Sequence, residues 1–146
     1  MALPEPECGL VISYAYLWRH ESTAGRTEGS KDRPCAIVLA VAGAGEEPVT
    51  VTVAPITHTA PHDPHLAVEI PAKVKRHLGL DETPSWIVLD EFNEFAWPGF
   101  DLRPVPGKRG RYDYGLLPSA LFTRIVQRVL ELRRAGKAYS LSREAR

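Results

Sequence analysis

Three short segments contain most of the residues in this sequence that could do chemistry. They are Glu28-x4-Arg33-Pro34, Pro55-Ile56-Thr57-His58 and the stretch from Leu89 to Trp97, which includes Asp90. The arginine supplies a permanently charged guanidinium whose planar fork of donors fits the oxygens of an anion. The threonine supplies a hydroxyl donor, and the carboxylates and imidazoles supply groups that can accept a proton. Each segment by itself is weak evidence for a catalytic site, because solvated charges and turn-forming residues are common at such positions.

The strand that must position Arg33 is expected directly after it. Residues 35–41 form a continuous apolar run between Pro34 and the Gly-rich segment 42–45. Such a run is typical of a strand buried on both faces, and Pro34 fits its first position, where no ladder hydrogen bond need be donated. The pattern therefore predicts a cation fixed at the rim of the core. The alternative for a lone arginine at this place is a solvated charge at the end of a strand.

The remaining patterns predict a mainly β domain with one long helix near the C-terminus. Further strands are expected over residues 9–18, 49–55, 66–70, 85–92 and 112–117, with 35–41 and 49–55 paired as an antiparallel hairpin. Helices are expected over 71–78, closed by Gly79, and over 118–135. Exposed loops are expected over 19–32 and 98–111, and tails over 1–8 and 138–146, leaving one domain over 9–137. These elements suggest a strongly bent antiparallel sheet or small open barrel with the long helix across one face.

The composition is that of an ordinary globular protein. The 146 residues are 44% hydrophobic and 25% charged, and 18 Lys and Arg balance 18 Asp and Glu, so the formal net charge is zero. This balance argues against a broad nonspecific coat for DNA but leaves room for a local basic groove. The two cysteines, Cys8 and Cys35, favour a reducing compartment over a disulfide framework. The sequence shows no signal-peptide pattern and no apolar run long enough for a membrane span, so we expect a cytoplasmic protein with no membrane partner.

Taken together, the order and spacing of the three segments resemble the PemK/MazF family of toxin endoribonucleases. That family shows a Gly-led first strand, a loop ending in Glu-x4-Arg-Pro, an apolar strand, a later Pro-x-Thr, an Asp-x-Val-x-x-Ile-x-Trp-like segment and a final helix. The matching positions here are Gly9, Glu28, Arg33-Pro34, Thr57, Asp90, Phe92, Phe95, Trp97 and the helix after Pro118. The resemblance covers roughly residues 9–135. The first loop is longer than is usual in the family, and residues 98–111 look inserted.

The resemblance implies an SH3-like small β-barrel of the PemK/MazF/CcdB kind that forms a homodimer. It implies cleavage of single-stranded RNA without a metal or other cofactor, in which the ribose 2′-OH attacks its own phosphate and leaves a 2′,3′-cyclic end. It also implies a cognate antitoxin protein that blocks the RNA groove. Arg33 and Thr57 would then donate to phosphate oxygens in the transition state, where the loss of one such donor typically costs about 10²–10³ in rate.

The proton acceptor for that reaction stays open among four residues, which are Glu28, Asp90, His58 and His20. His58 could share a site with Thr57 only if the strand before it has already ended, because adjacent strand residues face opposite sides. Structural alternatives also stay open: Thr57 could cap or turn its loop, Asp90 could be a surface carboxylate or turn former, and Glu28 could be a solvated loop charge. A metal site is not expected, because two prolines fix the backbone between His58 and His65 and no recognised zinc spacing is present.

Aromatic and basic residues supply candidates for contacts with RNA. Trp18, at the mouth of the long first loop, could stack on a base, whereas Trp86 is more typical of core packing. The candidates for contact with the RNA backbone are Lys31, Arg103, Lys108, Arg109 and Arg111. A solvated Arg-rich loop is the alternative for the last four.

Two other functions stay open at this point. A toxin of the same fold, the gyrase poison CcdB, binds its target without cutting RNA and would need neither Arg33 nor Thr57. A catalytically silent barrel with an interaction role is the second alternative. That alternative would be favoured if Arg33, Thr57 and Asp90 lay far apart, beyond the reach of one phosphate.

Overall fold

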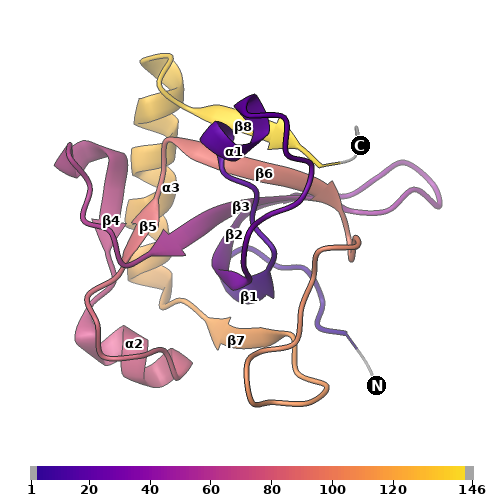
Figure 1. Cartoon of the computed structure of the whole chain (residues 1–146), viewed down its shortest axis with the longest axis horizontal. Coiled ribbons are helices and arrows are strands. Elements are labelled where there is room, and N and C mark those ends of the chain that lie inside the picture. Colours follow the sequence, from indigo (N-terminus) through magenta and orange to yellow (C-terminus); the bar gives the residue numbers. More distant parts are fainter. Residues whose placement is uncertain (1–2, 144–146) are drawn as a thin grey trace.

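The computed structural model describes residues 3–143, which form a mostly antiparallel sheet with a long helix near the C-terminus (Figure 1). The strands are β1 (Leu10–Tyr14), β2 (Arg33–Val41), β3 (Thr50–Thr57), β4 (Ala67–Glu69), β5 (Trp86–Val88), β6 (Glu91–Ala96), β7 (Asp113–Leu116) and β8 (Tyr139–Ser142). The helices are α1 (Arg19–Thr23), the 3-10 turn η1 (Pro64–Leu66), α2 (Ala72–Leu78) and α3 (Ser119–Arg134). The predicted mainly β class, the β2–β3 hairpin and the two predicted helices are confirmed.

The central strands bury both faces, and this packing fixes the strand ends that carry the candidate site. β1 is buried along its whole length. On one face Val11, Ala36 and Ile56 pack in a cluster with Ile125 of α3. On the other face the neighbouring residues of the same strands pack together in a second cluster that includes Ile12, Tyr14, Cys35, Val53 and Phe95. A strand between two apolar layers has little freedom to shift, so its ends are held in place.

The prediction that β2 is buried on both faces throughout is correct only for its first half. Cys35, Ala36 and Ile37 are fully buried, whereas Leu39 is 44% and Val41 51% exposed. β1 pairs with β2 only through residues 33–36, so residues 38–41 of β2 have no pairing with β1 on that side. The hairpin of β2 and β3 therefore projects beyond the body of the domain, as Figure 1 shows.

The single strand predicted over residues 85–92 is wrong, because the chain breaks at Leu89 and Asp90 into β5 and β6. Both pieces pair with β3, β5 at the end of β3 and β6 at its beginning. At the break, the Leu89 N–H donates to the Leu66 carbonyl at 2.8 Å instead of joining the β3 ladder. Asp90 is thereby taken out of regular pairing with β3.

The sheet is bent but its hydrogen-bonded path is not closed. Its strand order is β4-β5-β3-β2-β1-β7, with β6 paired to β3 and β8 paired to β6, and the end strands β4 and β7 do not pair with each other. Register shifts between residues 11 and 12 of β1 and between residues 37 and 39 of β2 mark the places where the ladders are irregular. Such irregularities increase local bending. Closure into an SH3-like barrel stays a prediction.

The predicted loop 19–32 contains a helical turn, α1, that sequence analysis missed. Glu21 accepts a hydrogen bond from the Trp18 N–H at 3.0 Å and closes the first turn. A five-residue helix carries too little periodicity to be detected from apolar spacing. The turn matters because it fixes the position of the Trp18 backbone after the buried segment 15–17 that follows β1.

The tail predicted over 138–146 is wrong for Tyr139–Ser142, which form β8 parallel to β6 (Figure 1). Arg143 follows β8 and is buried, with Nη1 donating to Asn93 Oδ1 and to the Ala15 carbonyl, each at 2.9 Å. Its Nη2 lies 3.2 Å from the carboxylate of Asp101. Asn93 in turn bonds the backbone of Leu17 through both its oxygen and its nitrogen. Residues 144–146 of the predicted tail and residues 1–2 lie outside the described residues.

Replacing Arg143 with alanine should destabilise the fold. The change leaves the Asp101 carboxylate, whose side chain is only 6% exposed, without this cation. Breaking a buried pair by removing one partner costs about 3–5 kcal/mol. Urea unfolding monitored by circular dichroism should show a free energy of unfolding lower by that amount. Arg133→Ala, at an exposed position in the last turn of α3, should change it by less than about 0.5 kcal/mol; equal values for the two variants would contradict the role of the buried pair.

Candidate functional site

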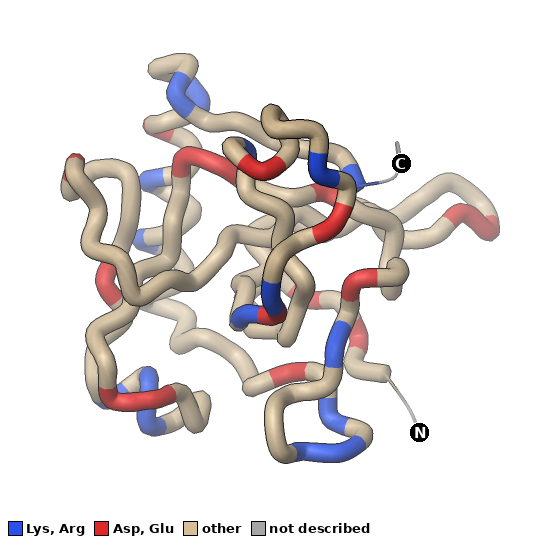
Figure 2. Tube along the Cα trace, in the orientation of Figure 1, with Lys and Arg blue, Asp and Glu red and all other residues tan. Residues whose placement is uncertain are grey.

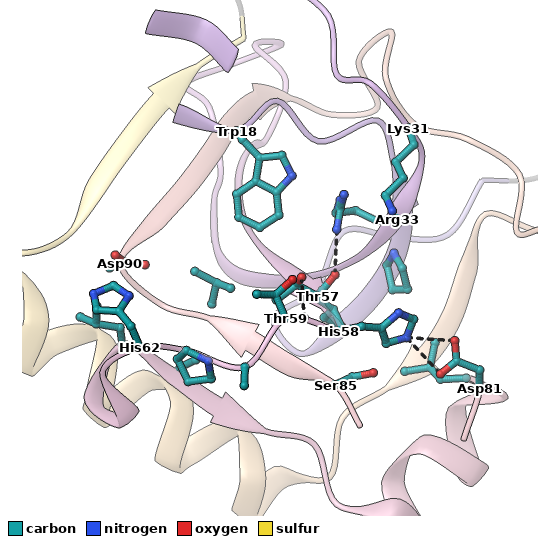
Figure 3. Close-up of a pocket in the computed structure, with 18 of the residues that line it drawn as sticks. Trp18, Lys31, Arg33, Thr57, His58, Thr59, His62, Asp81, Ser85 and Asp90 are labelled. Atoms are coloured by element: carbon teal, nitrogen blue, oxygen red, sulfur yellow. Dashed lines mark hydrogen bonds and ion pairs between the residues drawn. The ribbon is translucent and has the colours of Figure 1, made fainter. Parts of the chain in front are cut away.

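A cavity of about 640 Å³ opens where the ends of β2, β3 and β5 meet the loops around them (Figure 3). It brings together seven of the residues predicted for the site, which are Trp18, His20, Lys31, Arg33, Thr57, His58 and Asp90. Other residues on its wall are Asp32, Pro34, Ile56, Thr59, Ala60, Pro61, His62, Leu66, Ala67, Leu80, Asp81, Ser85 and Val88. In Figure 3 Arg33 and Thr57 lie in the middle, with His58 and Asp81 toward one end and Asp90 and His62 toward the other.

Arg33 lies at the first residue of β2 as predicted, and its side chain reaches this cavity. Nη1 donates to the Ile56 carbonyl over a long 3.4 Å, and the guanidinium carbon lies 5.0 Å from the centroid of the Trp18 ring. Nε is buried without a hydrogen-bond partner, and among residues 3–143 no carboxylate lies within ion-pair distance of Arg33. A cation held by one carbonyl and one aromatic face retains donors that an anion in the cavity could accept.

Trp18 forms the wall above Arg33. Its ring meets Tyr16 edge to face at 5.0 Å and is stacked with His20 at 6.3 Å between centroids. One side of the indole is thus fixed by the core while the residue still lines the cavity. An aromatic surface placed beside a guanidinium is suited to a flat, electron-rich ligand such as a nucleobase.

Thr57 and His58 share the cavity because β3 ends at Thr57. The alternation of strand side chains therefore no longer applies to His58, which meets the condition set by sequence analysis. The Thr57 hydroxyl oxygen accepts from the Thr59 N–H at 3.2 Å, so its own proton is available for donation. The His58 Nε2 lies 3.1 and 3.0 Å from the two carboxylate oxygens of Asp81.

Asp90 occupies the opposite end of the cavity from Asp81. Burial raises the pKa of its carboxyl above the ordinary value, and the opposing effects of its own backbone N–H and of nearby His62 and Arg19 are smaller. The neighbouring Glu91 is also half-buried and has a raised pKa from burial, although it accepts from the Tyr16 hydroxyl and the Arg19 N–H at 3.0 Å each. The break between β5 and β6 thus places a carboxyl of reduced acidity at one end of the cavity that Thr57 lines.

A second cavity of about 500 Å³ continues from the first one past Arg33. The two share Asp32, Arg33, Pro34, Leu80 and Asp81. The second is also lined by basic residues of α2 and of the loop before β7, which are Arg76, His77, Lys108 and Arg111. Figure 2 shows the corresponding blue segments on α2 and on that loop. Lys108 and Arg111 were predicted from the sequence as contacts for RNA, and Arg76 and His77 were not.

Three predicted residues do not line either cavity. Glu28 is an exposed loop residue, and Arg109 is exposed at the tip of the loop before β7. Arg103 is engaged in the fold, with its guanidinium 3.8 Å from Asp32 and 4.0 Å from Asp101 and with a hydrogen bond to the Phe100 carbonyl. Glu28 and Arg109 thus lie on the two long loops, away from the strand ends that form the cavity.

Asp81 and Lys75 are the functional candidates that sequence analysis missed. Asp81 lies in a segment of Gly, Asp, Thr and Pro that reads as an ordinary turn, and Lys75 lies on a short helix where lysine is normally solvated. Periodicity does give a signal for Lys75, since it follows the buried Val74 and precedes the buried Leu78 by three positions. Nothing in the sequence pairs either residue with His58.

The match to a protein-family model decides the family. The model of PemK-like, MazF-like toxins of type II toxin-antitoxin systems matches residues 16–96, which include Arg33, Thr57 and Asp90. The chain belongs to this toxin family. Comparisons with curated proteins and with solved structures give no match. Within residues 3–143 the toxin has no helix long and apolar enough to cross a membrane, and no group of three His, Cys, Asp or Glu residues arranged to hold a metal ion.

The raised pKa of Asp90 predicts how this residue affects stability as a function of pH. A folded-state pKa above the unfolded value means that the folded toxin binds the proton more tightly than the unfolded chain does. Stability contributed by Asp90 is therefore present at low pH and is lost as pH rises from the ordinary value of 3.8 through the raised pKa. The difference in unfolding free energy between wild type and Asp90→Asn should fall over that window in urea titrations. A difference that is constant or rises with pH would contradict the burial of this carboxyl.

Proposed function

We propose that this toxin is a metal-independent endoribonuclease that cleaves single-stranded mRNA and thereby inhibits growth. The observation that carries the proposal is the guanidinium of Arg33, which has no counter-charge and lies in one cavity with Thr57, with the acid–base groups His58, Asp90 and His20, and with the half-buried ring of Trp18. Family membership supports a toxin acting in a toxin-antitoxin system. The contacts of Arg33 support an anionic ligand, and a phosphodiester is the anion that RNA supplies.

The proposed reaction needs charge stabilisation and proton transfer and no group outside this cavity. The 2′-OH attacks the adjacent phosphorus, which places additional negative charge on the phosphate oxygens. Arg33 and Thr57 donate to those oxygens, and preorganised donors of this kind stabilise the charge as it develops. A proton acceptor takes the 2′-OH proton, and the cavity offers His58, Asp90 and His20 for that step. The products are a 2′,3′-cyclic phosphate and a 5′-hydroxyl.

The two continuous cavities offer a path for RNA on either side of the scissile phosphate. Trp18 stands over the first cavity, where a base can stack on the exposed part of its ring. Lys108, Arg111 and Arg76 line the second, where a flanking phosphate finds positive charge. Lys31 is exposed on the wall of the first cavity and serves the same purpose there. The acidic residues nearby are partly engaged, because Asp32 faces Arg103 and Asp81 faces Lys75.

A cognate antitoxin protein and a second copy of the toxin are the proposed protein partners. An antitoxin segment that carries carboxylates could occupy the cavity that we assign to RNA, because Arg33 and the cations Arg76, Lys108 and Arg111 of the second cavity attract either anion. Homodimer formation is part of the same proposal and is tested by light scattering of the purified toxin. No observation favours the gyrase-binding alternative or the silent barrel, since Arg33, Thr57 and Asp90 line one cavity.

The purified toxin should cut single-stranded RNA in the presence of EDTA, and Arg33→Ala should lower kcat by about 10²–10³ because one charged donor to the transition state is lost. The products, separated by electrophoresis and identified by mass spectrometry, should carry cyclic phosphate ends. Arg33→Lys keeps the charge but loses the planar fork, so it should recover only part of the rate.

Arg134→Ala is the matched control, because Arg134 is an exposed arginine in the last turn of α3 that lines neither cavity. Circular dichroism establishes that each variant is folded. Full activity of folded Arg33→Ala would overturn the proposed mechanism, and the absence of cleavage by the wild type across a random-sequence RNA pool would overturn the proposed activity.

A further inference from the structure

His58 is held at one end of the candidate site by a carboxylate that the sequence pattern does not associate with it. Nε2 lies 3.1 Å from Oδ1 and 3.0 Å from Oδ2 of Asp81 (Figure 3). An ionised carboxylate only accepts hydrogen bonds, so Nε2 must carry the proton in this contact. Nδ1 of the neutral ring then carries the lone pair, and no described residue forms a hydrogen bond with it. The imidazole is thus fixed in the tautomer in which a nitrogen is able to accept a proton.

Asp81 is itself fixed by a buried lysine. The side chain of Lys75 is only 5% exposed, and its Nζ lies 3.1 Å from Asp81 Oδ1. The same ammonium donates to Ser85 Oγ at 2.9 Å and to the Thr83 carbonyl, and the Thr83 N–H donates to Asp81 Oδ1 at 3.1 Å. An ammonium buried to this degree requires an anionic partner, which keeps Asp81 in place.

The electrostatics keep Asp81 ionised. Burial pushes the pKa of its carboxyl upward, but the hydrogen bonds from Lys75 and His58 and the positive charge of Lys75 outweigh burial and lower the pKa. The carboxylate therefore remains an acceptor for the imidazole. This three-residue arrangement of a buried cation, a carboxylate and a cavity-lining histidine serves no evident packing purpose for His58, which is exposed.

We propose that Asp81, anchored by Lys75, is the positioning residue for His58, and that His58 is the general base of the cleavage reaction. This inference rests on the proposed function, because a general base presupposes that the toxin cuts RNA. His58 is the catalytic residue in this assignment. Asp81 acts through His58 by holding the ring orientation and the tautomer.

The proton transfers of the proposed reaction use only His58, the RNA and water. Nδ1 of His58 takes the proton of the 2′-OH, the bond between 2′-O and phosphorus forms, and the bond between phosphorus and 5′-O breaks. The 5′ oxygen takes a proton from a water molecule of the open cavity, and the imidazolium returns its proton to the hydroxide so formed. The enzyme is regenerated, and the RNA ends in a cyclic phosphate and a 5′-hydroxyl.

The other proton acceptors in the cavity lack this support. The ring of His20 is stacked with Trp18, and no described residue forms a hydrogen bond with it. Asp90 has a raised pKa, but it lies at the other end of the cavity from His58, and the described contacts show no partner that orients its carboxyl toward Thr57. His58 also follows Thr57 directly, so it is the acid–base group tied most closely to a proposed donor of the site.

The test is a double-mutant cycle on RNA cleavage in EDTA. His58→Ala should lower kcat by about 10²–10⁴, the usual worth of a positioned general base. Asp81→Asn should lower kcat by at least about tenfold with a much smaller change in KM, because orientation of the ring affects the chemical step more than binding. The double variant should be no slower than His58→Ala, since Asp81 acts only through that ring. Additive losses in the cycle would overturn the positioning role.

A substrate with sulfur in place of the 5′ bridging oxygen separates a base from an acid. Sulfur leaves without a proton, so a variant that lacks only a general acid regains its rate on this substrate. The loss caused by His58→Ala should persist there. Recovery of the wild-type rate by His58→Ala on the sulfur substrate would overturn the assignment of His58 as the base.

Glu82→Gln is the matched control, because Glu82 is an exposed carboxylate next to Asp81 that lines neither cavity. It should keep wild-type kcat. If the wild type cleaves RNA and His58→Ala is fully active, the assignment of His58 is overturned and the proposed function stands. If the wild type does not cleave RNA, the proposed function is overturned as well.

The tautomer of His58 supplies a readout that needs neither activity nor a folded variant. Nitrogen-15 NMR of the wild-type toxin should show the His58 ring with its proton on Nε2. A neutral ring with the proton on Nδ1 would contradict the contact with Asp81 and with it the proposal.

Discussion

A cation without a counter-charge is the constraint on which the candidate site depends. Arg33 starts a strand in which residues 35–37 are fully buried, so the backbone that carries its guanidinium is held by the core. The group is held by the Ile56 carbonyl and the face of Trp18, and its Nε is buried without a partner. Leaving a charged donor partly desolvated costs free energy, and a bound anion offsets that cost. The lack of a counter-charge on Arg33 thus makes the cavity receptive to an anion.

The fold holds this arrangement by burying the strands on two faces. β3 pairs with β2, β5 and β6 along its length. Residues on its two faces belong to separate apolar clusters. The end of β3, with Thr57, is therefore fixed relative to the start of β2, with Arg33. At the other side of the sheet, Asn93 and Arg143 join the end of β1, β6 and the segment after β8 through buried hydrogen bonds. Those contacts secure the backbone from which Trp18 and α1 extend.

The acid–base groups of the cavity differ in the way that the protein holds them. Asp81 is kept ionised by Lys75 and His58, although more than half of its side chain is exposed. Asp90 is less exposed and is pushed toward its protonated form by burial. The pKa of Asp81 is lowered and that of Asp90 is raised, and the two carboxyls lie at opposite ends of one cavity. Asp81 therefore stays a hydrogen-bond acceptor, whereas Asp90 holds its proton more tightly.

The sequence by itself determined the mainly β class of the fold and the positions of Arg33 and Thr57 at strand ends. Continuous apolar runs and β-branched alternation specify strands because burial requires them, and Arg33-Pro34 and Thr57 lie at strand ends that local residue types define. Only the tertiary structure decided the rest. Asp81 contacts both His58 and Lys75 because the turn after α2 lies against the residue that follows β3, a contact that no local pattern encodes. Arg103 lies against Asp32, and Glu28 and Arg109 lie on long loops. Residues 139–142, which were expected in a tail, form β8. The physical reason is that propensity acts over a few residues, whereas burial, charge pairing and pairing of strand edges are settled between segments far apart in the chain.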